Sequence, residues 1–274
     1  MQQDTKALAR SSFYDNTIVI FTSDHGDLLS AHGNLHQKFY CAYEEIVHVP
    51  LVIHNRHLFP QYKSEYSLTN HVDLLPTMLG LANVDITSVQ RRLQNSFTEA
   101  RALVGNDLAP VIRGQSQGQM VDRPVYFMTD DDITRGQRQI NILGKAYPSV
   151  IQPNHVETVI ATLQTSSVKE LWKFSRYFDN TQFWSQPGVK DVTMQPVGNP
   201  IGDQYAYWTT QIKTQPDHDE YELYNLTNDP METCNLVHPA YATQQTRSVH
   251  QQMIYLLEEQ RRHKRLYPAQ SGVW

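Results

Sequence analysis

The chain has 274 residues, of which 40% are hydrophobic and 19% are charged. That balance is enough to bury a substantial core, and it excludes an intrinsically disordered chain. The 23 basic and 28 acidic residues leave a formal net charge of −5, so the positive charge that neutralises a run of phosphates is missing and we expect no nucleic-acid partner. Two cysteines, Cys41 and Cys234, are too few for a disulfide scaffold or a four-cysteine zinc site.

Neither a membrane span nor a leader is expected. The longest apolar runs, such as residues 18–21 and 39–43, fall far short of the roughly 20 residues that cross a bilayer. The first residues carry no basic segment that leads into an apolar one, as a signal peptide would. The sequence therefore predicts no membrane partner, and it leaves the compartment open.

Residues 1–150 are predicted to form an α/β domain. Residues 17–22 are mostly apolar or β-branched, which is typical of a strand buried on both faces. Asn70 or Asp73 is expected to cap a helix with Pro76 in its first turn. The expected elements, in chain order, are the end of a helix (4–13), two buried strands (17–22 and 49–53), two helices (70–81 and 89–104) and another buried strand (123–129).

Residues 151–274 have a different pattern of polar and apolar residues, which predicts a second, smaller domain. Three segments alternate polar and apolar residues, as antiparallel strands with one wet face do: 155–163, 168–178 and 220–226. A long loop is expected between the last two. Residues 240–265 predict an amphipathic helix with four apolar side chains turned inward: Val249, Met253, Leu256 and Leu257.

Candidate chemistry gathers where the first buried strand ends. Asp24, His25 and Gly26 follow it directly, at the position where open α/β sheets place their sites. Carboxylate oxygen and imidazole nitrogen are ligands for a divalent cation, and a glycine lets the backbone approach a ligand closely. Lys38 adds a positive charge that suits an oxyanion. The same residue types also fit a solvated loop in which Asp24 caps a helix.

This segment resembles the second metal-binding segment of the sulfatases, a family within the alkaline-phosphatase superfamily. The resemblance is carried by residues 17–53 in order and spacing, by the helix at residues 71–77 and by a hairpin at residues 222–232. It implies an α/β fold: the C-terminal part of an alkaline-phosphatase-like sheet sandwiched by helices, followed by a small antiparallel sheet with a C-terminal helix.

The resemblance also implies roles for individual residues. Asp24 and His25 would bind the metal, which in this family is usually Ca²⁺. Lys38 would contact the sulfate and the leaving-group oxygen, and we interpret His36 as a second sulfate contact. Glu44 and its neighbour Glu45 would pair with basic groups rather than act as acids.

One part of the family pattern is missing from the printed sequence. Sulfatases use a formylglycine nucleophile made from the cysteine of a Cys-x-Pro-x-Arg segment, and neither Cys41 nor Cys234 lies in such a segment. An Asp-Asp pair that supplies further metal ligands is also missing. We expect both to lie upstream of Met1, which makes this chain the C-terminal portion of a longer enzyme. The strand at residues 17–22 would then form an exposed apolar edge.

These inferences predict part of a sulfuric ester hydrolase that acts in full length on a sulfated sugar or a small sulfate ester. Without the nucleophile, this chain alone is expected to be inactive. An N-terminal half supplied in trans is the expected protein partner. Two alternatives stay open: a phosphodiesterase or phosphonate monoester hydrolase of the same superfamily, and an inactive split or decayed fragment.

Overall fold

The computed structural model describes residues 2–35, 38, 41–98, 100–115, 123–130, 155–165, 168–179, 192–196, 208–212 and 218–264. The chain forms two compact units, each made of two separate stretches. Unit 1 comprises Met1–Gly26 and Glu45–Val125, and unit 2 comprises Asp27–Glu44 and Tyr126–Trp274. The predicted domain boundary at residue 150 stays a prediction. None of the helices in the described ranges is both long and apolar enough to cross a bilayer.

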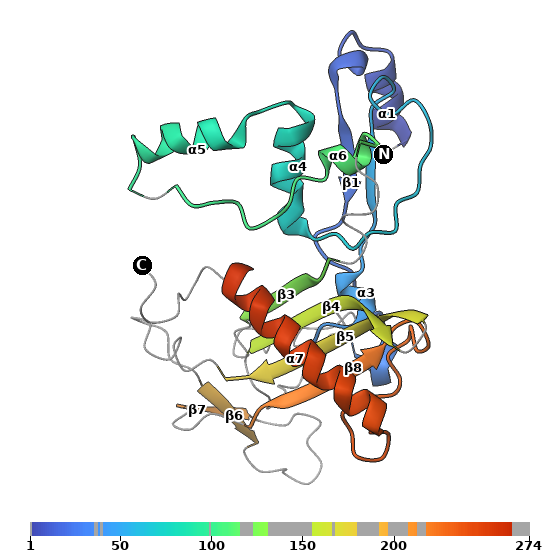
Figure 1. The fold of residues 1–274 in the computed structure, drawn as a ribbon, viewed down its shortest axis with the longest axis vertical. Coiled ribbons are helices and arrows are strands. Elements are labelled where there is room, and N and C mark those ends of the chain that lie inside the picture. Colours follow the sequence, from blue (N-terminus) through green and yellow to red (C-terminus); the bar gives the residue numbers. More distant parts are fainter. Residues whose placement is uncertain are drawn as a thin grey trace. The chain divides into compact units, whose positions relative to one another are not determined.

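Unit 1 contains short helices and a two-stranded antiparallel sheet (Figure 1). Its elements in chain order are α1 (Gln2–Ala9), the 3-10 helix η1 (Tyr14–Asn16), β1 (Val19–Thr22), most of α3 (Glu44–Val47), β2 (Leu51–His54), the 3-10 helix η2 (His71–Asp73), α4 (Leu74–Leu81), α5 (Ile86–Gln94) and α6 (Ala109–Ile112).

The predicted strand at residues 17–22 exists, but it is not buried on both faces. β1 pairs with β2 in the register Ile20 to Ile53 and Phe21 to Val52, and these two strands make up the whole sheet among the described residues. Phe21 is 42% exposed and Val52 is 52% exposed. With one neighbouring strand, β1 is therefore a partly exposed apolar strand rather than the centre of a sheet.

The helix predicted after residue 70 begins with the expected cap. The Asn70 side chain accepts from the backbone N–H of Val72, and the Asp73 carboxylate accepts from the N–H of Asn70, so the two residues form a capping box. Asp73 is fully buried and also accepts from Arg123 Nη2 at 2.8 Å. This network ties the start of α4 to the segment before β3.

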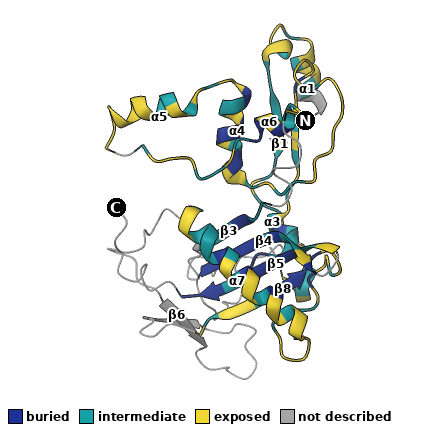
Figure 2. Cartoon of the chain, viewed as in Figure 1, coloured by how far each residue is buried: buried dark blue, intermediate teal, exposed yellow. Residues whose placement is uncertain are grey.

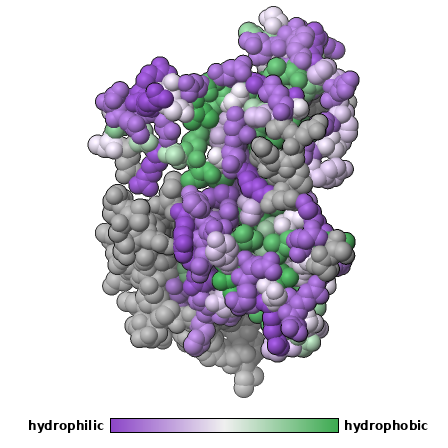
Figure 3. Space-filling model, in the orientation of Figure 1, coloured by the Kyte–Doolittle hydropathy of each residue, from purple (hydrophilic) through white to green (hydrophobic). Residues whose placement is uncertain are grey.

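The apolar face of α4 is only partly covered. Pro76, Thr77 and Leu81 are buried, whereas Leu75 and Met78 are about half exposed. Hydrophobic atoms accordingly reach the surface of unit 1 in Figure 3. The predicted helix at 89–104 is shorter, because α5 begins at Ile86, where Asp85 caps it through the Ser88 N–H, and ends at Gln94.

Unit 2 is built on a four-stranded sheet with the order β3-β4-β5-β8. Its strands are β3 (Val125–Asp130), β4 (His155–Thr165), β5 (Val168–Phe178) and β8 (Glu220–Asn225), and α7 (Gln244–Lys264) lies across them (Figure 1). β5 is antiparallel to both β4 and β8. The fold prediction, mixed α/β with an antiparallel sheet and a C-terminal helix, is confirmed.

One face of this sheet packs against α7 and forms the hydrophobic core. The sheet contributes Val159, Ala161, Trp172, Phe174 and Leu223, and α7 contributes Val249, Met253 and Leu257. These buried residues form the dark band along the strands and under the helix in Figure 2. The predicted inward face of the helix is therefore confirmed, with Leu256 packed partly buried at its margin.

The opposite face of the sheet was expected to be wet and is instead buried. Thr158 and Ser175 share a hydrogen bond of 2.8 Å between their hydroxyl groups at under 2% exposure. Lys173 and Tyr177 lie on the same face, since side chains two apart on a strand point the same way. Lys173 donates to the carbonyl of Ala42, which belongs to unit 2 although it lies early in the sequence, and Tyr177 donates to Glu222.

Two short strands lie where a long loop was expected between β5 and β8. β6 (Val192–Pro196) and β7 (Trp208–Ile212) pair antiparallel as a separate sheet. The weak sequence periodicity of this region gave no signal for them.

Candidate functional site

The loop that follows β1 is held by bonds between adjacent residues. Ser23 Oγ donates to the His25 carbonyl at 2.6 Å, and the His25 N–H donates to Asp24 Oδ1 at 3.0 Å. The Asp24 side chain is 86% exposed and the His25 side chain is 36% exposed. The two predicted metal ligands are therefore accessible from solvent, and Asp24 does not cap a helix.

The ring of His25 is oriented so that one nitrogen faces Asp24. Nδ1 lies 2.7 Å from the Gly26 carbonyl, and because a carbonyl only accepts, Nδ1 must carry the donated proton. In the neutral ring, that bond leaves the Nε2 lone pair available for a metal. Nε2 lies 3.6 Å from Asp24 Oδ2, so an imidazole nitrogen and a carboxylate oxygen converge on one point.

Gly26 is required where the loop ends. A Cβ atom at this position would lie 1.8 Å from the carbonyl oxygen of Glu45, which is a severe clash with backbone. The Gly26 N–H donates to the Ile46 carbonyl at 2.8 Å. Close backbone approach therefore fixes the end of this loop, residues 23–26, against the segment that begins α3. Because it carries the two predicted metal ligands, it is called the ligand loop below.

The other two predicted site residues are placed differently. Lys38 is exposed and belongs to unit 2, whereas Asp24 and His25 belong to unit 1. His36 lies outside the described residues. The catalytic roles of Lys38 and His36 stay predictions.

The backbone of residues 30–34 is strained. Ser30, His32 and Asn34 have φ angles of 79°, 49° and 70°, in the left-handed region that disfavours residues other than glycine. α2 (Ala31–Asn34) is therefore a kinked turn rather than a regular helix. Such strain persists only where surrounding contacts impose it. Here the His32 ring stacks on Tyr43, with 3.7 Å between centroids and 6° between planes.

A buried lysine forms the centre of unit 2's polar face. Lys173 is 1% exposed, its ammonium donates to the Ala42 carbonyl at 2.8 Å, and it forms ion pairs with Glu44 Oε1 and Glu232 Oε1, each also at 2.8 Å. The buried ammonium is therefore surrounded by three oxygen atoms. Glu232 Oε2 accepts from the Glu44 N–H at 2.6 Å. The prediction that Glu44 pairs with a basic group is confirmed.

Glu232 is the most constrained acid of this group. It is 3% exposed and has a φ of 53°. Burial raises the pKa of its carboxyl, and the Lys173 ammonium opposes that rise. The sequence had shown Glu232 only as part of a hairpin motif and had not shown Lys173 at all. Lys173 stands on the polar side of the alternation in this strand, so no local pattern marked it as buried.

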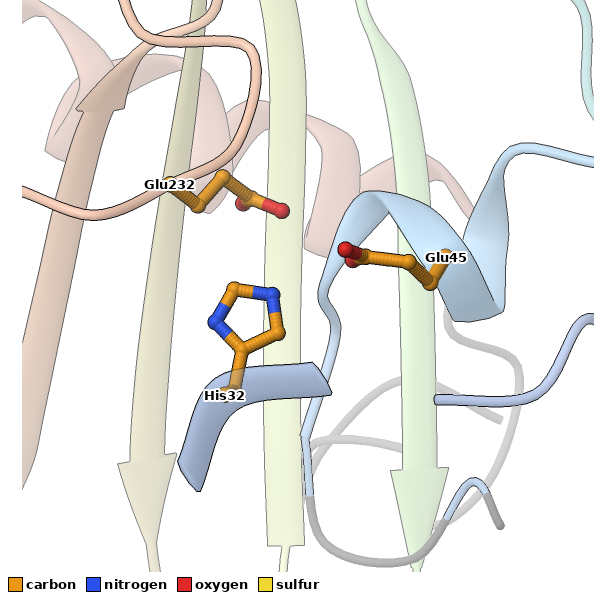
Figure 4. A group of neighbouring side chains, drawn as sticks. All are labelled: His32, Glu45 and Glu232. Atoms are coloured by element: carbon orange, nitrogen blue, oxygen red, sulfur yellow. The ribbon is translucent and has the colours of Figure 1, made fainter. Parts of the chain in front are cut away.

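Figure 4 shows the ring of His32 turned toward the Glu232 carboxylate. Their possible ligand atoms lie within 4.8 Å of one another. Glu45, drawn with them, belongs to unit 1. Lys173 already supplies the positive charge at Glu232, so we interpret this pair as part of the lysine network rather than as a metal site.

Two tyrosines of unit 2 donate hydrogen bonds to the same carboxylate on the polar face of the sheet. Tyr43 Oη donates to Glu222 Oε1 at 3.1 Å, and Tyr177 Oη donates to Glu222 Oε2 at 2.8 Å. Burial, followed by the charge of Glu222, raises the pKa of both phenols. The phenols therefore stay protonated and act as fixed donors, which holds Tyr43 on the sheet.

Comparison with known proteins identifies the first part of the chain. Residues 3–84 match the sulfatase family model. The chain is 41% identical over 73 residues to the uncharacterized sulfatase YidJ of Escherichia coli (strain K12), covering 26% of this chain and 14% of YidJ. It is 35% identical over 74 residues to an N-acetylglucosamine-6-O-sulfatase of Bacteroides thetaiotaomicron, covering 27% and 13%. Arylsulfatase K of Danio rerio is 37% identical over 127 residues, covering 45% and 21%.

Solved structures share the fold over nearly the whole chain. BT4656, determined in complex with its substrate D-glucosamine-2-N,6-O-disulfate, superposes with a TM-score of 0.54 at 19% identity, covering 97% of this chain and 38% of that chain. BT1596, a 2-O GAG sulfatase, superposes with a TM-score of 0.52 at 18% identity, covering 93% and 38%.

The structural comparison thus shows a fold that this chain shares with solved sulfatases. In sequence, residues 3–84 are similar to the sulfatase family, and the curated relatives are matched over part of their length. The chain spans well under half the length of the relatives described above.

Proposed function

We propose that this chain is the C-terminal part of a sulfatase-type hydrolase that in full length hydrolyses a sulfate ester. The observation that carries the proposal is the convergence of Asp24 Oδ2 and His25 Nε2, 3.6 Å apart, within the segment that matches the sulfatase family. Acids and imidazoles are common side by side, but here Gly26 and the orientation of the His25 ring fix both atoms at the end of a strand.

The residues present fit part of a divalent metal site. Asp24 and His25 would supply one oxygen and one nitrogen ligand, and we propose Ca²⁺ as the metal. Ca²⁺ takes about six to eight oxygen ligands, so two ligands from this loop would bind it only weakly. A cation held there would offset the negative charge of the sulfate oxygens.

Lys38 and His36 would act on the ester itself. The Lys38 ammonium would contact the sulfate and stabilise negative charge on the leaving oxygen, and His36 would add a second contact to the sulfate. The printed sequence contains no Cys-x-Pro-x-Arg segment, so a formylglycine nucleophile does not fit among the residues of this chain. We propose that it belongs to another part of the enzyme.

A sulfated sugar is the proposed substrate class. The relatives include an N-acetylglucosamine-6-O-sulfatase, and the structural neighbour BT4656 holds a glucosamine disulfate. A phosphodiester or phosphonate monoester is the alternative, because sulfate and phosphate esters differ mainly in charge and both suit a cation and a lysine.

Exposed apolar residues support a covering partner for unit 1. Phe21 on β1, Val52 on β2, and Leu75 and Met78 on α4 all lie at the surface. We propose that the N-terminal part of the sulfatase fold, in the same chain or in trans, covers them. If no such part exists, the chain is the inactive fragment named as an alternative above.

Calcium titration calorimetry on the full chain tests the metal ligands. We expect weak binding that Asp24→Asn and His25→Gln each abolish and that Asp27→Asn, a nearby acid, leaves intact. Hydrolysis of a sulfated and a phosphorylated sugar should then be measured with and without the N-terminal portion of a sulfatase relative in trans. Turnover by the chain alone would contradict the missing nucleophile, and preference for the phosphate would replace sulfatase with the alternative.

A further inference from the structure

Residues 41–44 follow Lys38 closely in the sequence and are anchored to the sheet of unit 2. Ala42 is buried and its carbonyl accepts from Lys173, and Tyr43 Oη donates to Glu222 on β8. On the other side of Lys38 in the sequence, the His32 ring stacks on Tyr43. Residues 41–44 are called the strap below.

The strap is close enough to control Lys38. Ala42 follows Lys38 by four residues, and even a fully extended chain of that length spans at most about 14 Å. Two of the three Lys173 acceptors, the Ala42 carbonyl and the Glu44 carboxylate, belong to the strap. The third acceptor, Glu232, also binds the strap through the Glu44 N–H.

Lys173 is costly to bury, which argues that its contacts decide where the strap lies. An ammonium loses its hydration when it is 1% exposed and is tolerated only where acceptors surround it. A displaced strap would remove two of its three acceptors and leave a buried charge with Glu232 alone. The strap therefore has one favourable position rather than several.

We propose that Lys173 is a positioning residue for Lys38, acting through the strap with Glu44 and Glu232 as its partners. The proposal rests on the proposed function, because it is the sulfate contact of Lys38 that gives this position a purpose. Lys173 itself touches no substrate, since it is enclosed on the polar face of the sheet.

Hydrogen exchange on the full chain tests the anchor without any substrate. In Lys173→Met, the amides of residues 41–44 are expected to exchange about tenfold faster or more, while those of α7, on the other face of the sheet, keep their rates. Lys169→Met, at an exposed lysine of the same strand, is the matched control and should change neither. Unchanged exchange at 41–44, or equal acceleration in α7, would overturn the proposal.

A gentler variant covers the case in which Lys173→Met does not fold. Glu44→Gln removes one charged acceptor and leaves Lys173 paired with Glu232. It should accelerate exchange in the same four residues to a smaller extent, with a melting temperature near that of the unaltered chain. If residues 41–44 keep their exchange rates in this folded variant, the anchor does not hold the strap.

The effect of the strap on Lys38 is measured by the reactivity of the Lys38 amine toward an acetylating reagent. Sodium sulfate is expected to protect Lys38 from acetylation by an N-hydroxysuccinimide ester in the unaltered chain and in Lys169→Met, and this protection should fall in Glu44→Gln and Lys173→Met. Full protection in those variants would overturn the positioning role. If sulfate fails to protect Lys38 even in the unaltered chain, the proposed sulfate contact is wrong, and the exchange experiment still decides whether Lys173 holds the strap.

Discussion

The ligand loop of unit 1 and the lysine network of unit 2 differ in their exposure and in the contacts that hold them. Asp24 and His25 lie exposed, and bonds to their immediate neighbours orient them. Lys173 and Glu232 are buried, and contacts between segments far apart in the sequence hold them. The metal contact proposed for Asp24 and His25 needs access from solvent, whereas the anchoring role proposed for Lys173 needs enclosure. The two regions therefore differ both in exposure and in the sequence separation of the contacts that hold them.

The largest difference should appear when side chains are truncated in the two sheets. Leu223→Ala removes a fully buried side chain of β8 from the core that the sheet forms with α7 and is expected to lower the free energy of unfolding by about 2–5 kcal/mol. Val52→Ala on the half-exposed β2 should change it by no more than about 0.5 kcal/mol. Urea unfolding measures both, and a large loss from Val52→Ala would show that β2 is covered in solution.

A smaller effect is expected at the end of the ligand loop. Gly26→Ala places a methyl group against the Glu45 carbonyl and should cost about 3 kcal/mol, because backbone cannot rotate away as a side chain can. Gly114→Ala is the control, since its φ is 70° but nothing lies within 4 Å of the added carbon; it should cost about 1–2 kcal/mol. Only Gly26→Ala should also weaken calcium binding, which calorimetry would show.

Removing the helix cap should have a still smaller effect. Asn70→Ala deletes the acceptor for the Val72 N–H and is expected to cost about 1 kcal/mol. Asn95→Ala, at the exposed end of α5 where the backbone is right-handed, should change stability by less than about 0.5 kcal/mol. Equal thermal unfolding of the two variants would mean that the Asp73 network, rather than Asn70, begins α4.

The smallest expected effect is a pH dependence in unit 2. The His250 ring packs against Phe174 and Tyr221, and burial lowers the pKa of its imidazole. The unfolded chain therefore binds this proton first, so stability is full above the ordinary histidine pKa of about 6.5 and falls as the pH drops through the lower folded value. His250→Gln should flatten urea midpoints measured between pH 7 and 5, whereas His263→Gln, at the exposed end of α7, should leave their slope unchanged.

Local sequence patterns predicted the elements that depend on local rules. Alternation found β4, β5 and β8, and helical spacing found α7 together with its buried face. Asn70 was recognisable as a cap from its residue type and from the helix that follows. Within the candidate site, the end of the strand indicated where the loop with Asp24 and His25 lies, whereas the pairing of Glu44 was an implication of the family resemblance.

Other features depend on contacts that no local pattern contains. The polar face of the sheet has the sequence of a wet face, and only the strap, whose Ala42 lies 131 residues before Lys173, makes it a buried one. The exposure of β1 could not be read from its own residues, because burial of a strand is set by its neighbours. Lys173 escaped notice for the same reason: its role needs Glu44 and Glu232, which come from two other parts of the chain.

The division of the chain into interleaved stretches has a consequence for how it folds and how it can be cut. The strap lies between two stretches of unit 1, so the chain enters unit 2, returns, and enters it again. Loop closure between the strap and β5 spans more than a hundred residues, which makes this contact a late and slow step compared with the β4–β5 hairpin. A piece excised from residue 126 onward would keep its helix-covered core but would leave Lys173 with Glu232 as its one remaining partner of the three.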